Sequence, residues 1–339
     1  MKKHSTLKDV ASRARVSIAT VSRVINSNIP KSASKEVQDR IWSAVKELNY
    51  IPNTTAQNLK TGKNKNKPHK VIACVFSRCT ISQADPFFLE ISQALESEML
   101  KYGYLVKYSI SSIEMSEDEF LTVLNQDSIE GIVVLGRIDE KSMRTIKSLH
   151  KYVVYVGLNR LNFDIDQVIC DGYDAAMMAL EYLNSTGEHV IHYLGECQNE
   201  VRYTAFYHFM SRTVPQNEIS DLIIETDFNS EQAYSKVMKI IREGIIPKAL
   251  FCGNDMAAIG ALKALRENNI KVPEDTAVIG IDNIEMSQFS IPMLTTIEIP
   301  KEHLGRKAAR FLIDRIINGN DINVTMQIPM KLIKRESTK

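Results

Sequence analysis

The sequence Ser17-Ile18-Ala19-Thr20-Val21-Ser22-Arg23-Val24-Ile25-Asn26 decides how the first part of this chain folds. Its apolar residues recur at helical spacing, whereas the opposite face is small and polar. The serine that opens the stretch is placed to cap the helix, and Arg23 is expected to project from the polar face. A short basic helix with small leading side chains can enter the major groove of DNA, which is about 12 Å wide.

Two more helices are predicted around this stretch. One begins at Thr6, whose hydroxyl can cap it, and a tight turn over residues 14–16 leads into the opening stretch. A third helix runs from about Ser34 until Pro52 ends the pattern. The three helices are expected to share one small core. The buried stripe of the first helix is Leu7, Val10, Ala11 and Ala14.

Charge divides the chain in two. Residues 1–67 hold 14 Lys and Arg against 4 Asp and Glu, a net charge of +10, and the remainder carries −9. A small module of such positive charge is typical of proteins that bind the phosphate backbone of nucleic acid. The negative net charge of the remaining residues is ordinary for a globular domain.

No targeting or membrane segment is predicted. The longest apolar runs have the length of strands, far below the ~20 residues that span a bilayer, and the basic N-terminus continues into an amphipathic pattern. We therefore expect a cytoplasmic protein. The five cysteines lack a C-x-x-C pair and are interpreted as buried free thiols, while His189 and His192 fall on opposite faces of a strand. No metal or cofactor is expected.

After residue 69, strand-like and helix-like segments alternate. This rhythm predicts βαβ units in an α/β fold with parallel sheets. Because the series occurs twice, we expect two lobes with a ligand-binding cleft at the strand ends. The predicted strands are residues 71–76, 105–109, 132–135, 153–157 and 168–170 in the first series and 189–194, 222–225, 249–252, 277–280 and about 326–332 in the second.

Several motifs resemble the lactose and galactose repressor (LacI/GalR) family. In the headpiece they are Thr6-Leu7-Lys8-Asp9-Val10-Ala11, Val16-Ser17, residues 20–26 and Leu48-Asn49-Tyr50-Ile51-Pro52-Asn53. In the body they are Pro86-Phe87-Phe88, residues 130–134, Arg202 with Phe206, Asn254-Asp255-Met256-Ala257, Gly280-Ile281-Asp282-Asn283 and Leu294-Thr295-Thr296-Ile297. The resemblance covers nearly the whole chain.

The resemblance implies a helix-turn-helix headpiece followed by a periplasmic-binding-protein-like body of two lobes. The chain is expected to cross between the lobes near Glu188, Ile291 and Asn320. The headpiece would span residues 1–60, with a hinge helix at about 53–60 and a linker at 61–69. The first lobe would comprise 70–187 and 294–320, and the second 188–293 and 321–339. The family acts as homodimers on palindromic double-stranded operator DNA, so no membrane partner is expected.

The DNA contacts follow from the same resemblance. Ser17 and Ser22 are assigned to the phosphate backbone, and Ile18, Ala19 and Arg23 to the bases, where Arg23 could pair with a guanine. An apolar hinge wedge, here Leu59, would kink the DNA from the minor groove. Further expected contacts are Thr6, Leu7, Thr20, Asn26, Tyr50, Asn53 and Ala56. Arg15 stands where the family usually has Gly in the turn, at a cost of about 1 kcal/mol if its φ is positive.

The effector contacts are expected in the cleft. Arg202, Asn254 and Asp282 stand at positions where the family hydrogen-bonds its effector, and polar groups of this kind suit sugar hydroxyls. The alternatives are an exposed salt-bridge set for these residues and ordinary core packing for the aromatic ones. Ala205 and Ile299 depart from the family pattern, so the local packing there is less well predicted. The other expected contacts are Phe87, Phe88, Phe228 and, at the pocket wall, Arg160.

The sequence therefore predicts a dimeric repressor of sugar-utilisation genes that an inducer releases from DNA. A galactoside is the favoured effector because of the Ile18-Ala19 pair and Phe228. Alternatives are a regulator of the same family that needs a corepressor or a protein partner, and a sugar-binding transport protein, which would have no use for the basic headpiece. The chain has no phosphate loop, metal-protease motif or nucleophile elbow, so no enzyme is expected.

Overall fold

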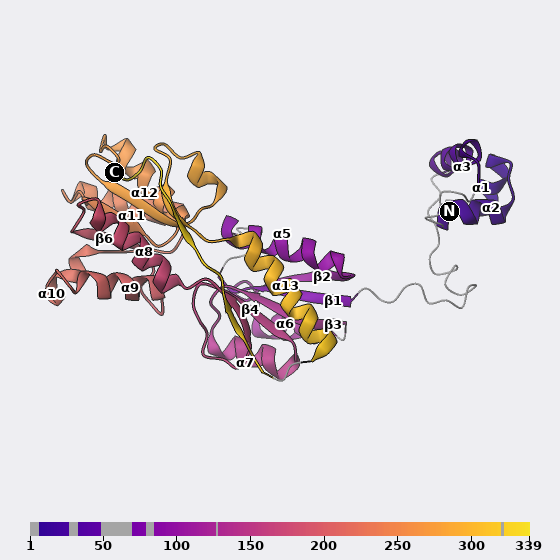
Figure 1. Ribbon diagram of the computed structural model, residues 1–339, viewed down its shortest axis with the longest axis horizontal. Coiled ribbons are helices and arrows are strands. Elements are labelled where there is room, and N and C mark those ends of the chain that lie inside the picture. The colour runs from indigo at the N-terminus through magenta and orange to yellow at the C-terminus, as the bar shows by residue number, and fades with distance from the viewer. Residues whose placement is uncertain (1–6, 27–32, 49–69, 79–84, 127, 320–321) are drawn as a thin grey trace. The chain divides into compact units, whose positions relative to one another are not determined.

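The computed structural model describes residues 7–26, 33–48, 70–78, 85–126, 128–319 and 322–339. The chain divides into two compact units, Met1–Pro68 and His69–Lys339. Figure 1 shows the helices labelled α1, α2 and α3 in the first unit and an α/β body in the second. No helix in the described parts is long and apolar enough to cross a membrane.

In the described part of the first unit, three helices share one apolar core. The helices are α1 (Leu7–Ala14), α2 (Ile18–Asn26) and α3 (Lys35–Glu47), close to the predicted ranges. On the surface, Arg13 of α1 pairs with Glu47 at the end of α3. The fully buried core side chains are Val10, Ala11, Ala14, Val21, Val24, Ile41 and Ala44.

The first lobe of the body contains a six-stranded, fully parallel sheet. Its spatial order is β11-β5-β4-β3-β1-β2. The four central strands are almost entirely buried because helices cover both faces, whereas the two edge strands are partly exposed. The strands are β1 (Lys70–Phe76), β2 (Tyr104–Ser111), β3 (Ile129–Leu135), β4 (Val153–Gly157), β5 (Asp166–Ile169) and β11 (Thr325–Gln327).

The second lobe repeats this arrangement. Its sheet has the order β12-β10-β9-β8-β6-β7, parallel except for the antiparallel pair of β10 and β12. The α/β fold with two parallel-stranded lobes is therefore confirmed. The strands are β6 (Ile191–Gly195), β7 (Ile223–Glu225), β8 (Ala249–Cys252), β9 (Ala277–Asp282), β10 (Thr295–Glu298) and β12 (Lys331–Ile333).

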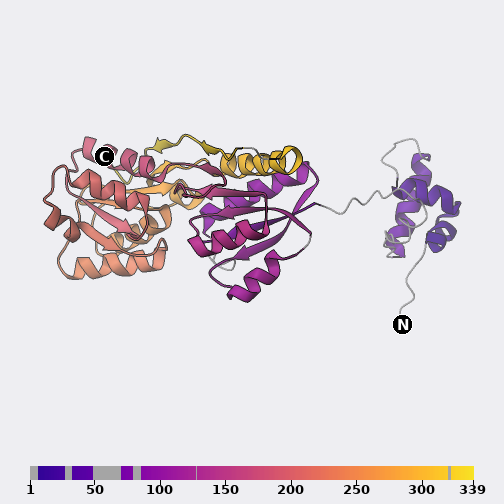
Figure 2. The ribbon, with the colours of Figure 1, turned by 90° about the horizontal axis from the view of Figure 1, so that it is seen from below.

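Alternating strand residues send their side chains to opposite faces, and each face packs on its own helices. In the first lobe, α5 (Pro86–Lys101) and α13 (Lys301–Asn318) cover one face, and α6 (Glu117–Leu124) and α7 (Glu140–Leu149) the other. In the second, α8 (Gly172–Ser185) and α9 (Val201–Met210) lie opposite α11 (Ser230–Arg242) and α12 (Asp255–Glu267). Figure 2 shows these layers from a second side. A short α10 (Gln216–Ile219) follows α9.

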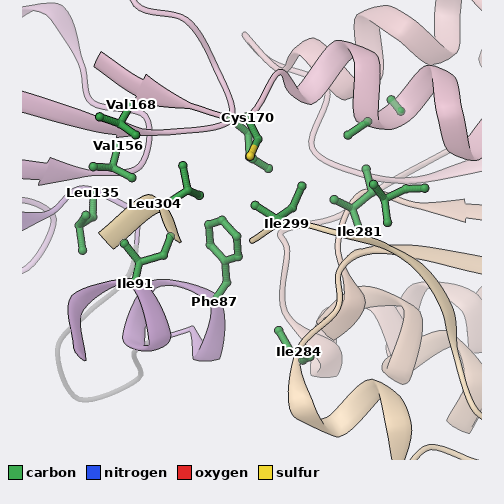
Figure 3. Packing of buried hydrophobic residues seen from close by; sticks show 14 of the residues in the cluster. Phe87, Ile91, Leu135, Val156, Val168, Cys170, Ile281, Ile284, Ile299 and Leu304 are labelled. Carbon is green, nitrogen blue, oxygen red and sulfur yellow. The ribbon is translucent and has the colours of Figure 1, made fainter. Parts of the chain in front are cut away.

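One apolar cluster runs through both lobes. Figure 3 shows Phe87, Ile91 and Leu304 of the first lobe continuing through Ile299 to Ile281 of the second. Ile299, where the sequence departs from the family, is fully buried at this junction. The lobes are thus joined by packed side chains as well as by the chain itself.

The predicted lobe boundaries are wrong at all three crossings. Helix α8 packs on β9 and β10 of the second sheet, so the chain crosses before Gly172 and not near Glu188. Strand β10 pairs with β9, which moves the second crossing from Ile291 to the residues after Glu298. The last extended segment splits: β11 joins the first sheet and β12 the second. The third crossing therefore lies between Gln327 and Lys331, beyond the predicted Asn320.

Candidate functional site

Helix α2 begins with the capped turn that the sequence predicts. The backbone N–H of Thr20 donates to Ser17 Oγ at 3.1 Å, and the two hydroxyls lie 2.8 Å apart. Capping of this kind satisfies a backbone donor that the helix leaves open at its first turn. This hydrogen bond holds the first turn of α2 in place, and the side chains at the start of the helix are exposed.

The exposed face of α2 carries the predicted base-reading residues. Ile18 is 49% exposed, and Ala19 and Arg23 are also exposed, whereas Val21 and Val24 are buried in the core. Arg23 Nε donates to the carbonyl of Ala19 at 3.3 Å, which directs the guanidinium toward the start of the helix. Ser17 is exposed, and Thr20 and Ser22 are half-buried.

The turn before α2 is strained at Arg15. Its φ is +53°, in the region that favours glycine, as expected for a position where the family uses Gly. Arg15 is exposed beside the start of α2. Other predicted DNA contacts, Thr6, Tyr50, Asn53, Ala56 and Leu59, lie outside the described residues, as do the side chains of Leu7 and Asn26.

A cleft of about 940 Å³ lies between the two lobes. Its walls are the loops that follow the carboxyl ends of strands, where open α/β sheets bind ligands. Both lobes contribute, through the start of α5 in the first and the starts of α9, α11 and α12 in the second. The structure brings six of the seven predicted effector contacts together here: Phe87, Phe88, Arg202, Phe228, Asn254 and Asp282.

Arg160 is the exception. The side chain is exposed and does not line the cleft, so the expectation that Arg160 forms the pocket wall is wrong. The chain turns after β4 so that the preceding Asn159 faces the cleft instead, with its Nδ2 donating to the carbonyl of Asn199 at 3.2 Å.

Arg202 is buried and held in a fixed orientation. Its Nε and Nη2 donate to the carboxylate of Glu200 at 2.7 and 2.9 Å, and its Nη1 donates to the carbonyl of Gly253 at 2.6 Å. The guanidinium also lies over the ring of Phe228, 4.1 Å from its centroid. These contacts stabilise the charged form and hold the pKa of Glu200 below its usual value despite burial.

Ion pairs across the cleft join the lobes, and the sequence did not predict them. Arg78 and Arg137 each follow a strand of the first lobe, and both pair with Glu196, which follows β6 in the second. Arg137 also donates to the carbonyl of Gln198 at 2.9 Å. Their shared position just beyond a strand end is the signal that could have identified them.

The turn that carries Asp282 is held in an unusual conformation. Asp282 and Asn283 have φ values of +122° and +50°. The buried Lys301 ammonium donates to the carbonyls of both, at 2.6 and 2.9 Å, and lies 3.6 Å from Glu90 of α5. Lys301 therefore links the Asp282 turn of the second lobe to the first lobe.

The site also contains a buried tyrosine hydroxyl, and several cysteines lie in the two lobes. Tyr155, on β4, lines the cleft with a buried hydroxyl that has no hydrogen-bond partner among the described residues. Cys74, Cys170 and Cys252 are buried as predicted, Cys197 is only half-buried, and Cys79 lies outside the described residues. Within the described ranges, no cluster of side chains is suited to hold a metal ion.

Comparisons with known proteins agree with this geometry. Residues 6–53 match the family model of bacterial regulatory proteins of the lacI family, and residues 180–338 match a periplasmic binding protein-like domain. The HTH-type transcriptional repressors PurR of Salmonella arizonae and Escherichia fergusonii are 31% and 32% identical, over 98% of this chain and 96% of theirs. The chain belongs to the LacI family.

Solved structures place this LacI-family chain in the same fold. The lac repressor bound to ONPG in its repressed state is 26% identical, with a TM-score of 0.70 over 99% of this chain and 100% of that one. The complex of the transcriptional regulator CelR with cellobiose has a TM-score of 0.68 at 24% identity, over 98% and 99% of the two chains, and shows the fold alone.

The protein is therefore a DNA-binding transcriptional repressor whose body binds a small-molecule effector. It shares with its family the homodimer and the operator DNA as partners. The relatives named above are regulators and not enzymes.

Proposed function

We propose that this repressor controls sugar-utilisation genes and that a sugar-like inducer in the interlobe cleft releases it from DNA. The observation that carries the proposal is the convergence of three aromatic and three polar predicted contacts from both lobes on one cavity. Aromatic faces with a few fixed polar groups suit a hydroxyl-rich ligand. Such a repressor acts on cytoplasmic DNA and needs no enzymatic activity, cofactor or metal.

The DNA half of the proposal rests on the exposed face of α2. Ile18 and Ala19 offer apolar contacts suited to a thymine methyl, and Arg23 can pair with a guanine. Ser17 and Ser22 are assigned to phosphates, and Leu59 to the minor-groove wedge. Only three side chains then read the bases, so much of the affinity comes from the phosphate contacts.

Effector binding and DNA binding would be coupled through the relative rotation of the lobes. A ligand between them competes for the space that the Arg78, Arg137 and Glu196 pairs now bridge, and so alters the relative rotation of the lobes. Such two-state coupling is typically worth about 1 to 3 kcal/mol. The same coupling could tighten DNA binding, so a corepressor remains the second candidate within this family.

The test is a gel-shift titration of the full-length protein on a palindromic duplex selected from random sequence, with and without sugars. We expect specific binding that a sugar, a galactoside first among them, weakens by about 5- to 150-fold. Tighter binding in the presence of ligand would show a corepressor. Absence of specific binding at physiological salt would contradict the proposal.

A further inference from the structure

The arginines of the cleft are already bound to carboxylates. Arg202 holds both oxygens of Glu200, and Arg78 and Arg137 share Glu196. The described lining contains no other arginine and no lysine. An anionic ligand would therefore have to break an existing pair to obtain a cation.

The described walls of the cleft carry more carboxyl groups than cations. Six carboxyl groups line the described walls against three guanidinium groups, and the arginines pair with only two of the six. Asp227 accepts from the side chain of Gln232 at 2.7 Å, on the rim. A ligand that enters must therefore supply hydrogen-bond donors and, for full compensation, positive charge. The carboxyl groups outside the arginine pairs are Asp85, Asp227, Glu231 and Asp282.

Asp282 is the deepest of these groups. The residue is 3% exposed, and its carboxyl group accepts no hydrogen bond from the residues that the structure describes. Lys301 binds its backbone carbonyl and not its side chain. Burial and the negative charges of Asp255 and Asp85 raise its pKa well above the ordinary value for aspartate, although the charges of Arg202 and Lys301 act in the opposite direction. Because Asp282 lines the cleft, a ligand there can donate to its carboxyl group.

Asp85 faces Asp282 from the other lobe. It precedes α5 and accepts one hydrogen bond, from the backbone N–H of Phe87 at 3.0 Å. Burial raises its pKa, although the charges of Arg78, Arg202 and Lys301 act in the opposite direction. Those three cations have the partners described above. A positive group between Asp85 and Asp282 would stabilise the ionised form of one carboxyl group from each lobe.

We propose that the effector carries a protonated amine that binds between Asp85 and Asp282, as an amino sugar would. This inference rests on the proposed function, because it specifies the ligand of the same cleft. The hydroxyl of Tyr155, buried and without a partner in the described structure, is placed to bond a ligand hydroxyl. The ammonium brings three donors and a positive charge to acceptors that now lack them.

The test compares sugars that share a ring and carry a positive, a neutral or a negative substituent. Full-length protein is titrated calorimetrically at pH 7 with D-glucosamine, D-glucose and D-glucose 6-phosphate, and with the three corresponding galactose compounds. We expect at least one amine to bind about tenfold or more tightly than its neutral parent, which corresponds to about 1.4 kcal/mol, and both phosphates to bind most weakly.

Three variants test whether the two cleft carboxyl groups cause the preference for the amine. Asp282→Asn and Asp85→Asn should each abolish the preference for the amine, and asparagine at 85 can still cap α5. Asp118→Asn, on the exposed start of α6 in the first lobe, is the matched control and should keep it. The melting temperature of each variant, measured without ligand, shows whether it folds.

The proposal is overturned if no amine binds below about 10 mM, if a phosphate binds more tightly than its amine, or if the preference survives both cleft variants. Gel shifts on the selected operator distinguish a failure of the amine proposal from a failure of the proposed repressor function. Specific operator binding with a preference for neutral sugar would reject the amine and retain the repressor. Loss of specific operator binding would reject both.

Discussion

At the scale of single residues, Asp282 shows how a binding site costs stability. Its carboxyl group is buried among other acids, and its backbone is held at positive φ by Lys301. The hydrogen bonds of Lys301 stabilise the turn, whereas the buried carboxyl group costs stability and places an acceptor in the cleft. Buried carboxyl groups and non-glycine residues at positive φ, both costly to folding, are characteristic of functional sites.

Asp282→Asn should therefore raise the melting temperature at pH 8. The pKa of Asp282 is raised in the folded state, so the folded form keeps a proton that the unfolded form loses above about pH 4. Folding stability consequently falls as pH rises from there toward the folded pKa. Asparagine removes this loss, so the gain should be larger at pH 8 than at pH 5 in calorimetric melting. A gain independent of pH, or a loss at pH 8, would contradict the burial of a titrating carboxyl group.

At the scale of elements, periodicity predicted the helices and most strands, but not which sheet each one joins. The helical pattern of residues 172–185 gives no indication that α8 covers the second sheet. Strand β10 is four residues long and pairs with β12, more than thirty residues later, so no local pattern identifies it. The ion pairs of Arg78 and Arg137 with Glu196 escaped prediction for the same reason, since they form only when the lobes meet.

The closest helix contact in the first lobe gives a direct test of element packing. A Cβ added to Gly305 of α13 would lie 2.3 Å from the carbonyl oxygen of Ile91 in α5. Gly305→Ala should destabilise the body by about 1 to 3 kcal/mol in urea unfolding followed by circular dichroism, because two helix backbones must separate. Lys307→Ala, exposed on the same helix, is the control. Equal stability of the two variants would contradict the packing of α13 on α5.

At the scale of the whole molecule, the second lobe exposes apolar side chains that a homodimer could cover. Phe289 is 76% and Ile291 73% exposed, and Met286 and Met293 of the same segment are partly exposed. Exposed apolar groups gathered in one segment are typical of protein–protein interfaces. We infer that this segment meets the partner copy.

Phe289→Glu should shift sedimentation at micromolar concentration from dimer toward monomer and weaken operator binding, because two half-sites are no longer bound together. Ile245→Glu, on another exposed apolar residue of the same lobe, is the control and should remain a dimer. A dimeric Phe289→Glu protein would place the interface elsewhere.

We propose that the dimeric repressor reads DNA through the exposed face of α2. The most direct measurement is the fluorescence anisotropy of labelled operator and scrambled duplexes at physiological salt, with wild type and Arg23→Ala. Wild type should prefer the operator, and Arg23→Ala should lose about 1 to 3 kcal/mol of that preference for each guanine contact while retaining binding to scrambled DNA. Equal operator preference in the two proteins would contradict the account.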